Sequence, residues 1–399
     1  MRVSFATAKR GALAATAAVA LFSASVSSHA ELGAKLQDAV SYQENLSHTG
    51  RIDFAGGFTA PLKQLWSVDL NAYASYPVTG EGMVFVTAGN NNSSFLYALD
   101  ITTGAVIWEK LLPGTSTWAE SAYDEGKVFV INGSGVLMAF RATSGKKLWS
   151  AQLSGYGYYN SSFGAPAAGN GLVVLQYLNQ NYTGTIVAFD EATGSVKWTV
   201  SPGGSANVGV SGLAAISKDG IFLDDSEDAL RLSPVDGSTI WSTPANCSGG
   251  DVPVLWRSMV YATRSSCSDN KILNATDGTE SGSYAGSTSP VMLSNKSLLV
   301  TVGGILYAYS PKNYNVNWSF EGNGQFNLKP LVVNGVVVAL STNGTLYLID
   351  GRSGTQLWDT TLPYGGYSGG ADAGLAAGEG VLLVPNGTIL YAFAPWTNR

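Results

Sequence analysis

The chain has 399 residues, with 22 Lys and Arg against 28 Asp and Glu. Its formal net charge of −6 argues against nucleic acid and anionic membrane surfaces as partners, because both require a basic footprint. Charged residues make up only 13% of the chain, whereas there are 48 Gly and 19 Tyr. This composition favours an all-β protein with many tight turns.

The N-terminus has the pattern of a secretory signal peptide. Arg2, Lys9 and Arg10 precede an apolar run over 11–22, and Ala30 ends a small-residue cleavage site. We expect residues 1–30 to be removed, followed by a lead-in segment over 31–61 and one domain over 62–399. A retained N-terminal anchor is the alternative. No other apolar run approaches 18 residues, so we expect no membrane span and a periplasmic or secreted protein.

The chain has two cysteines, Cys247 and Cys267. In an oxidising compartment such a pair usually forms a disulfide, which is our expectation. A metal site is poorly supported, because His48 is the one histidine left after signal removal and no CxxC occurs.

A repeat is visible at residues 96–108, where an apolar strand ending in Asp100 is followed by Gly104 and Trp108. The Asp can accept backbone hydrogen bonds that start a turn, and the Gly supplies the positive φ that closes it. A Trp at this fixed place is expected to pack on the neighbouring unit, with its indole N–H bonded to a backbone acceptor. The structural Trp positions are Trp66, Trp108, Trp149, Trp198, Trp241, Trp318 and Trp358, with a degenerate position near Tyr284. Tyr314 stands where the other units have the turn glycine.

Each repeat is preceded by a second hairpin, such as residues 76–86, so one unit of about 40 residues contains four strands, A to D. Four-stranded units at this period are typical of propeller blades. Both the C and the D positions count to eight, and they are offset. The opening D strand around Trp66 is therefore expected to pair with the closing C strand around Tyr391. The predicted fold is an all-β, eight-bladed propeller of four-stranded antiparallel blades.

The motif Leu-Tyr-Ala-Leu-Asp-x-x-Thr-Gly-x-x-x-Trp at 96–108 resembles the PQQ-repeat, or quinoprotein-like, propeller family over residues 62–396. Residues 41–50 resemble the lead-in of that family. Its propeller lipoproteins of outer-membrane assembly are similar in size, but this chain lacks their lipid-bearing Cys. The family also includes dehydrogenases that hold pyrroloquinoline quinone (PQQ) over Ca²⁺, so a PQQ-dependent oxidoreductase is the alternative function.

Several chemical signatures are missing from the sequence. The two cysteines are not adjacent, as they often are in quinoprotein dehydrogenases, and no matching set of calcium ligands stands at the motif positions. The acidic run over 224–228 could bind Ca²⁺, or could be a solvated turn between strands B and C. No catalytic triad is visible, and no carboxylate pair is singled out. We therefore expect no catalytic residue, no metal site and no cofactor, with PQQ and calcium as the alternative.

The two faces of the predicted ring differ. We call the face of the A–B and C–D turns the turn face, and the face of the B–C and D–A loops the loop face. The loop-face segments are longer and rich in rings and amides, which suits adaptable recognition. The candidate binding residues are Tyr73, Tyr76, Trp118, Tyr158, Tyr159, Asn160, Tyr182, Tyr364 and Tyr367.

These loops suggest a function without catalysis. We expect a monomeric binding or scaffold propeller of the cell envelope, whose loop face recognises an envelope or extracellular protein or a glycan. The alternative is that these are ordinary polar propeller loops whose aromatic side chains cover the ends of the blades.

Overall fold

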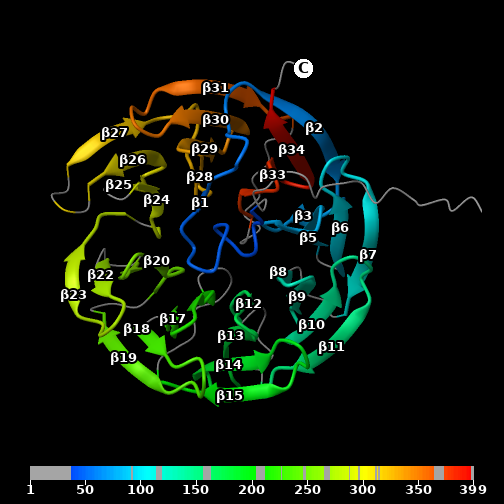
Figure 1. Ribbon diagram of the computed structural model, residues 1–399, viewed down its shortest axis with the longest axis vertical. Coiled ribbons are helices and arrows are strands. Elements are labelled where there is room, and N and C mark those ends of the chain that lie inside the picture. Colours follow the sequence, from blue (N-terminus) through cyan, green and yellow to red (C-terminus); the bar gives the residue numbers. More distant parts are fainter. Residues whose placement is uncertain are drawn as a thin grey trace, which may run out of the picture. The chain divides into compact units, whose positions relative to one another are not determined.

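The computed structural model describes the chain in thirteen stretches: residues 37–90, 93–113, 119–155, 163–203, 212–225, 227–245, 249–264, 270–286, 288–294, 297–310, 312, 315–363 and 373–396. All of them belong to one compact unit, Leu36–Arg399. In this unit eight β-sheets surround a common axis (Figure 1), which confirms the predicted eight-bladed propeller.

Each blade is an antiparallel meander whose strands run outward from the axis in the order A to D. Blade 1 comprises β4 (Val78–Gly80), β5 (Met83–Asn90), β6 (Ser93–Asp100) and β7 (Val106–Leu112), with β3 (Tyr73–Ala74) also pairing to β5. Blade 2 comprises β8 (Ala119–Asp124), β9 (Lys127–Asn132), β10 (Val136–Arg141) and β11 (Lys147–Gln152). Blade 3 comprises β12 (Ala167–Gly169), β13 (Leu172–Leu178), β14 (Gly184–Asp190) and β15 (Val196–Val200). Blade 4 comprises β16 (Ala215–Ser217), β17 (Gly220–Asp224), β18 (Asp228–Leu232) and β19 (Thr239–Pro244).

The second half of the ring repeats the plan. Blade 5 comprises β20 (Val254–Trp256), β21 (Met259–Ala262), β22 (Lys271–Asn274) and β23 (Glu280–Ser283). Blade 6 comprises β24 (Val291–Ser294), β25 (Ser297–Val302), β26 (Ile305–Tyr309) and β27 (Val316–Phe320). Blade 7 comprises β28 (Leu331–Val333), β29 (Val336–Leu340), β30 (Thr345–Asp350) and β31 (Gln356–Thr361). Blade 8 comprises β32 (Ala376–Gly378), β33 (Val381–Asn386), β34 (Ile389–Pro395) and β2 (Leu62–Asp69).

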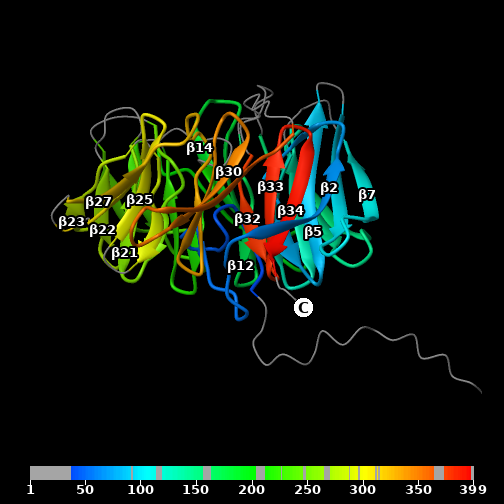
Figure 2. The same cartoon turned by 90° about the horizontal axis from the view of Figure 1, so that it is seen from above.

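Blade 8 joins the two ends of the ring. Its outer strand β2 comes from the N-terminal side of the chain and pairs antiparallel with β34, with Trp66 opposite Ala392. Figure 2 shows these two strands side by side in the same sheet. A closed ring leaves no sheet edge exposed at the join between first and last blade.

The turn after strand C has the predicted chemistry. In blade 1 the Asp100 carboxylate accepts the N–H groups of Thr102 and Thr103 at 3.0 and 2.8 Å. Hydrogen bonds from the Thr102 and Thr103 side chains and backbone hold the pKa of Asp100 below its usual value. Gly104 adopts φ 72° and has a second constraint, because an added Cβ would lie 2.7 Å from the Trp66 ring. The glycine is therefore required both for the turn and for the close approach of the next blade.

The Trp of one blade and the turn of the following blade form a repeated contact, which we call the indole clamp. The indole ring packs on the turn glycine, and its N–H donates to a backbone carbonyl beside that glycine. The donor–acceptor pairs are Trp66–Ile101 at 2.9 Å, Trp108–Ala142 at 2.7 Å, Trp149–Glu191 at 3.0 Å, Trp198–Pro234 at 3.1 Å, Trp241–Ala275 at 3.1 Å and Trp318–Gly351 at 3.0 Å. Each of these six side chains packs on the turn of the neighbouring blade.

The sequence predicts a degenerate clamp position near Tyr284, but the strand register of blade 5 places that position at Gly282. Gly282 lies opposite Ile272, as Trp108 lies opposite Ala98 in blade 1. The side chain at the clamp position is therefore absent. Tyr284 comes two residues later, is buried, and shares a 2.5 Å hydrogen bond with the Thr263 hydroxyl.

The lead-in closes the axis at the turn face. Its carbonyls accept N–H groups from the inner strands of six blades, and a side chain serves a seventh (Figure 1). The pairs are Thr79–Ala39, Tyr123–Val40, Ile216–Leu46, Leu255–Ser47, Met292–Thr49, Val332–Gly50 and Ala377–Glu44 Oε1, all at 2.7–2.9 Å. In blade 3, Leu46 Cδ1 lies 2.4 Å from where a Cβ on Gly169 would stand. One short segment thus touches all eight blades.

The indole clamp predicts a position-dependent cost of truncation. Trp108→Ala removes a buried indole and its hydrogen bond, so we expect a loss of about 3–5 kcal/mol in the free energy of unfolding. Ile107 is on the same strand but 47% exposed, and Ile107→Ala should change it by less than about 0.5 kcal/mol. Denaturant unfolding followed by Trp fluorescence measures both. Equal effects of the two substitutions would contradict a clamping role.

Candidate functional site

Two of the predicted binding residues are exposed on the loop face. Tyr73, in the D–A connection leading into blade 1, is 44% exposed. Tyr182 follows β13 in the B–C loop of blade 3, is 63% exposed and adopts φ 59°. The loop around Tyr182 is fixed by the Asn179 carboxamide, which accepts the N–H groups of Asn181 and Thr183. The exposed Tyr182 ring therefore projects from a turn of defined conformation.

Tyr76 lies elsewhere. It is buried, its hydroxyl donates to Ser121 O at 2.9 Å, and its ring meets Tyr42 of the lead-in edge-on. Sequence spacing marked it as a loop residue, but the chain has already entered the inner wall of blade 1 at this point. Its role is to position the lead-in.

The other predicted positions lie outside the described residues. They are Trp118, Tyr158, Tyr159, Asn160, Tyr364 and Tyr367, together with Cys247 and Cys267.

A buried ion pair crosses the axial wall between blades 5 and 7. Lys329 Nζ lies 2.8 and 2.9 Å from the two carboxylate oxygens of Asp251, and 5.4 Å from the centroid of the Tyr42 ring. Burial alone would raise the pKa of Asp251, but Lys329 and the backbone N–H groups of Ser289 and Val252 lower it overall. The carboxylate is thus held ionised and fully hydrogen-bonded.

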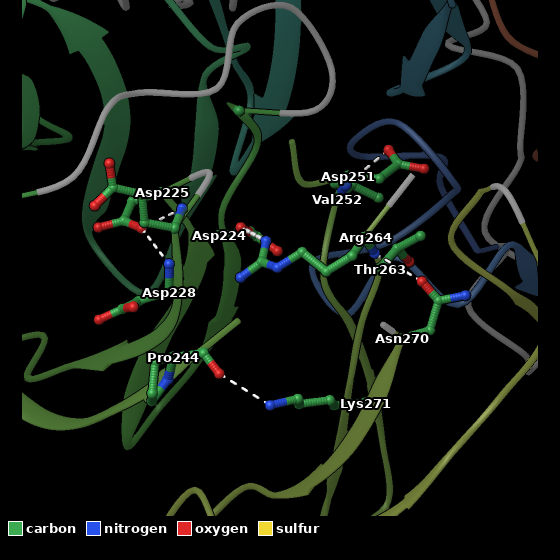
Figure 3. Close-up of polar contacts among 12 residues, drawn as sticks. Asp224, Asp225, Asp228, Pro244, Asp251, Val252, Thr263, Arg264, Asn270 and Lys271 are labelled. Carbon is green, nitrogen blue, oxygen red and sulfur yellow. Dashed lines mark hydrogen bonds and ion pairs between the residues drawn. The ribbon is translucent and has the colours of Figure 1, made fainter. Parts of the chain in front are cut away.

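A second buried ion pair joins Asp224 at the end of β17 to Arg264 beyond β21 (Figure 3). Both side chains are almost completely buried, and the Arg264 backbone N–H donates to the Asn270 carboxamide at 2.7 Å. Breaking such a pair would leave a charge unpaired in a dry environment, which is strongly destabilising. The pair therefore fixes the contact of blades 4 and 5 below the loop face.

The acidic run over 224–228 forms the B–C turn of blade 4. Asp225 Oδ1 accepts the backbone N–H groups of Glu227 and Asp228 at 3.1 and 2.7 Å, so it caps its own turn (Figure 3). With Asp224 paired to Arg264, the carboxylates point to different partners. Among the described residues no group of three His, Cys, Asp or Glu side chains could hold a metal ion.

These donors do not fit the metal-bound quinone that some propellers of this type hold. The carboxylates of Asp224 and Asp251 already face Arg264 and Lys329 of the chain itself. A calcium site would require such oxygens to be directed together at one ion. We derive no chemical step through such a group.

The lead-in carries two buried titratable groups that sequence reasoning did not assign to the core. Burial raises the pKa of Glu44 well above 4.5, although the Ala377 N–H donates to its Oε1 at 2.9 Å. Burial lowers the pKa of His48 to about 4, and its Nδ1 lies 3.1 Å from Pro253 O. His48 is therefore neutral near pH 6, and burial favours the neutral acid form of Glu44. In the sequence, Glu44 and His48 are marked only as members of the lead-in before the first blade.

Sequence reasoning also missed the buried charges. Lys329 and Asp251 each come directly before an apolar inner strand, and a charge at that point of an apolar repeat is the signal that could have marked them. The partner of each one depends on the closed ring, because 78 residues separate Asp251 from Lys329.

The lead-in predicts loss of stability at both ends of the pH range. The native state keeps Glu44 protonated above 4.5, so stability is lost as the pH rises through its raised folded pKa. It keeps His48 neutral below 6.5, so stability is also lost as the pH falls from 6.5 toward 4. Thermal unfolding midpoints measured from pH 4 to pH 9 test both arms.

Two substitutions separate the arms. Glu44→Gln keeps an acceptor for the Ala377 N–H. It should remove the loss of stability above pH 4.5 and leave the loss at acidic pH unchanged. His48→Asn keeps a donor toward Pro253 O. It should remove the loss of stability below pH 6.5 and leave the loss at higher pH unchanged. Unchanged pH profiles in both variants would contradict the assignment.

Within the described residues, no helix has the length and apolar character needed to cross a membrane.

Comparison with known proteins finds relatives with different named activities. It is 22% identical to the tetrathionate hydrolase of Acidithiobacillus ferrooxidans, over 67% of this chain and 55% of that protein. It is 27% identical to the outer membrane protein assembly factor BamB of Moranella endobia, over 59% of this chain and 55% of that protein. The chain thus spans about half the length of these curated relatives.

A solved structure with the same fold is the quinohemoprotein alcohol dehydrogenase from Comamonas testosteroni. It superposes with a TM-score of 0.70 at 15% identity, covering 91% of this chain and 82% of that one. The family model described as "Outer membrane protein assembly factor BamB" matches residues 92–252 and 253–397, which is well over half of the chain. The chain therefore belongs to the BamB family of PQQ-repeat propellers.

Proposed function

We propose that the protein is a non-catalytic binding propeller of the cell envelope, which holds a polypeptide partner on its loop face. The description of its family names an assembly factor for outer membrane proteins, and this supports a protein partner. A glycan would use the same rings and amides and is the alternative ligand.

One observation carries the proposal: the lead-in fills the axis at the turn face. Ala39 to Ile52 hydrogen-bond to the inner strands near the A–B turns, and Tyr42 packs between Tyr76 and Lys329. The opposite end of the axis carries the long loops. A partner that uses the mouth of the ring would thus approach the loop face.

The axial wall supports a binding role over a catalytic one. Its charged groups at Asp251 and Asp224 are paired with Lys329 and Arg264, so none of the four is left for proton transfer. Exposed Tyr73 and Tyr182 instead offer rigid rings with polar tips, which suit recognition at low entropic cost.

The proposal includes export. The N-terminal pattern over 1–30 supports passage into the periplasm or beyond, and the negative formal charge suits a partner without an acidic surface. No cofactor is part of the proposed function, and the quinone-dependent oxidoreductase remains the alternative.

We also infer a disulfide between Cys247 and Cys267. Gly250 and Arg264 form an isolated antiparallel bridge, and each cysteine is three residues from one member of that pair on the same side. Directly opposed residues of antiparallel strands have Cα atoms about 4.5–5.5 Å apart, within the span of a disulfide. Oxidation would transfer two electrons and two protons to a dithiol–disulfide exchange partner.

The recognition proposal predicts that exposed loop-face rings carry binding. Tyr73→Ala combined with Tyr182→Ala, and separately Trp118→Ala with Tyr158→Ala and Tyr159→Ala, should lower recovery of partners from envelope extract at least tenfold. Val235→Ala is the matched control, because Val235 is 84% exposed in a C–D turn on the opposite face. Partners retained by both loop-face variants would reject the proposal, and loss with Val235→Ala would point to the wrong face.

The proposed disulfide can be detected by mass spectrometry, because it blocks alkylation of both cysteines and links their two peptides. Protein isolated from the envelope should resist thiol alkylation, and non-reducing digestion should give one peptide pair linking residues 247 and 267. Cys247→Ser should lower the thermal midpoint by several degrees, because a loop of 21 residues is released in the unfolded chain. Two alkylated cysteines in the native protein would refute the bond.

A further inference from the structure

The indole clamp is missing from two seams of the ring. In the seam between blades 5 and 6, Gly282 takes the place of the Trp. In the sequence, Tyr314 stands where the other units have the turn glycine, and it lies outside the described residues. In the seam between blades 7 and 8, blade 8 has no C–D turn, because β34 and β2 come from opposite ends of the chain, so Trp358 has no turn glycine to pack on. Within the described part of the chain its indole has no backbone acceptor, and its ring meets Phe393 edge-on at 6.5 Å.

These two seams enclose blades 6 and 7. The seam between blades 6 and 7 has a complete clamp, in which Trp318 packs on Gly354 and donates to Gly351 O at 3.0 Å. Blades 6 and 7 are therefore joined to each other as tightly as blades 1 to 5 are. They lack the same connection on either side.

The seam between blades 5 and 6 is held by other contacts. Among the described residues, the nearest atom to a Cβ added on Gly282 is Ile272 Cδ1 at 3.9 Å, so the position itself tolerates a side chain. Tyr284 instead bonds to Thr263, which in turn donates to the Ser289 hydroxyl at 3.1 Å. This buried polar network stands beside an apolar cluster that the two blades share, and its hydrogen bonds have modest net strength.

The lead-in makes its densest contacts with these same two blades. Thr49 O and Gly50 O accept N–H groups from Met292 in blade 6 and Val332 in blade 7, at 2.9 and 2.8 Å. The strand β1 (Arg51–Ile52) pairs in parallel with β28, and the Arg51 guanidinium donates to Leu293 O at 3.0 Å.

The last part of the lead-in is fixed by Asn334 in the A–B turn of blade 7. Its carboxamide accepts from Phe54 N at 2.9 Å and donates to Phe54 O at 3.0 Å, while its own backbone N–H donates to Ile52 O. We call residues 49–54 the strap. No other blade is bound by a paired strand of the lead-in in the described structure.

We propose that blades 6 and 7 open as one unit, and that the strap is the device that holds this unit in the ring. The two unclamped seams define where the ring parts, and the strap together with the Asp251–Lys329 ion pair crosses the break. Both seams keep buried apolar clusters that join their blades, and the missing clamp is what sets them apart from the other seams. Local opening begins where a connection is missing, so amides in β24–β31 become exchangeable before those of blades 1–4. A strap released from β28 would also expose an unpaired strand edge at the axis.

Hydrogen exchange followed by mass spectrometry tests the proposal on the full mature chain. In the wild type, the slowest amides of β24–β31 should exchange faster than those of blades 1–4. Asn334→Gly keeps the positive φ of 50° while removing both side-chain bonds to Phe54, and should speed exchange in β24–β31 about tenfold, without changing blades 1–4. The matched control is Asn170→Gly, at the same turn position of blade 3 with φ 57° and an exposed side chain, which should change neither.

A second variant restores the missing clamp. Gly282→Trp combined with Tyr314→Gly supplies an indole and a turn glycine, and should slow exchange in β24–β31 several-fold, even in the Asn334→Gly background. Exchange that rises equally in all blades of Asn334→Gly, or only within the turn around Asn334, would overturn the proposal. So would wild-type rates in β24–β31 no faster than in blades 1–4.

Discussion

The structure depends on one contact, the bond from the indole N–H of one blade to a backbone carbonyl of the next. A Trp on the outer strand would be costly to bury with its N–H unpaired, and the carbonyl beside the turn glycine removes that cost. Only glycine fits at position 104, because the Trp66 ring occupies the space that a Cβ would need. Turn, glycine and Trp therefore form one unit that spans two blades.

The lead-in adds a second kind of connection. Indole clamps join neighbouring blades at the periphery, whereas the lead-in joins inner strands across the axis through backbone carbonyls from Ala39 to Ile52. Burial there raises the pKa of Glu44 and lowers the pKa of His48. Filling the axis at the turn face leaves the loop face as the end available to a partner, and this asymmetry links the fold to the proposed function.

The relatives carry the names of an assembly factor and of enzymes. In this chain the carboxylates of Asp224 and Asp251 are bound by Arg264 and Lys329. Such pairs are weak evidence for stability, but they hold neighbouring blades in a defined arrangement. The chain thus uses its axial charges to join blades 4 to 7 and to support the surface above them.

The sequence determined the number of blades, the Asp100-type turns, the turn glycines and six indole clamps, because each repeats with a side-chain signature at fixed spacing. It could not place Tyr76 in the core, since that depends on where a loop enters the wall. The four-residue spacing after Gly278 does point to Gly282 rather than to Tyr284, and the strand register agrees with that spacing. Only the tertiary structure decided the contacts of the lead-in and the partners of Asp251 and Asp224. Backbone carbonyls leave no mark in a sequence, and those ion pairs join residues that become neighbours when the ring closes.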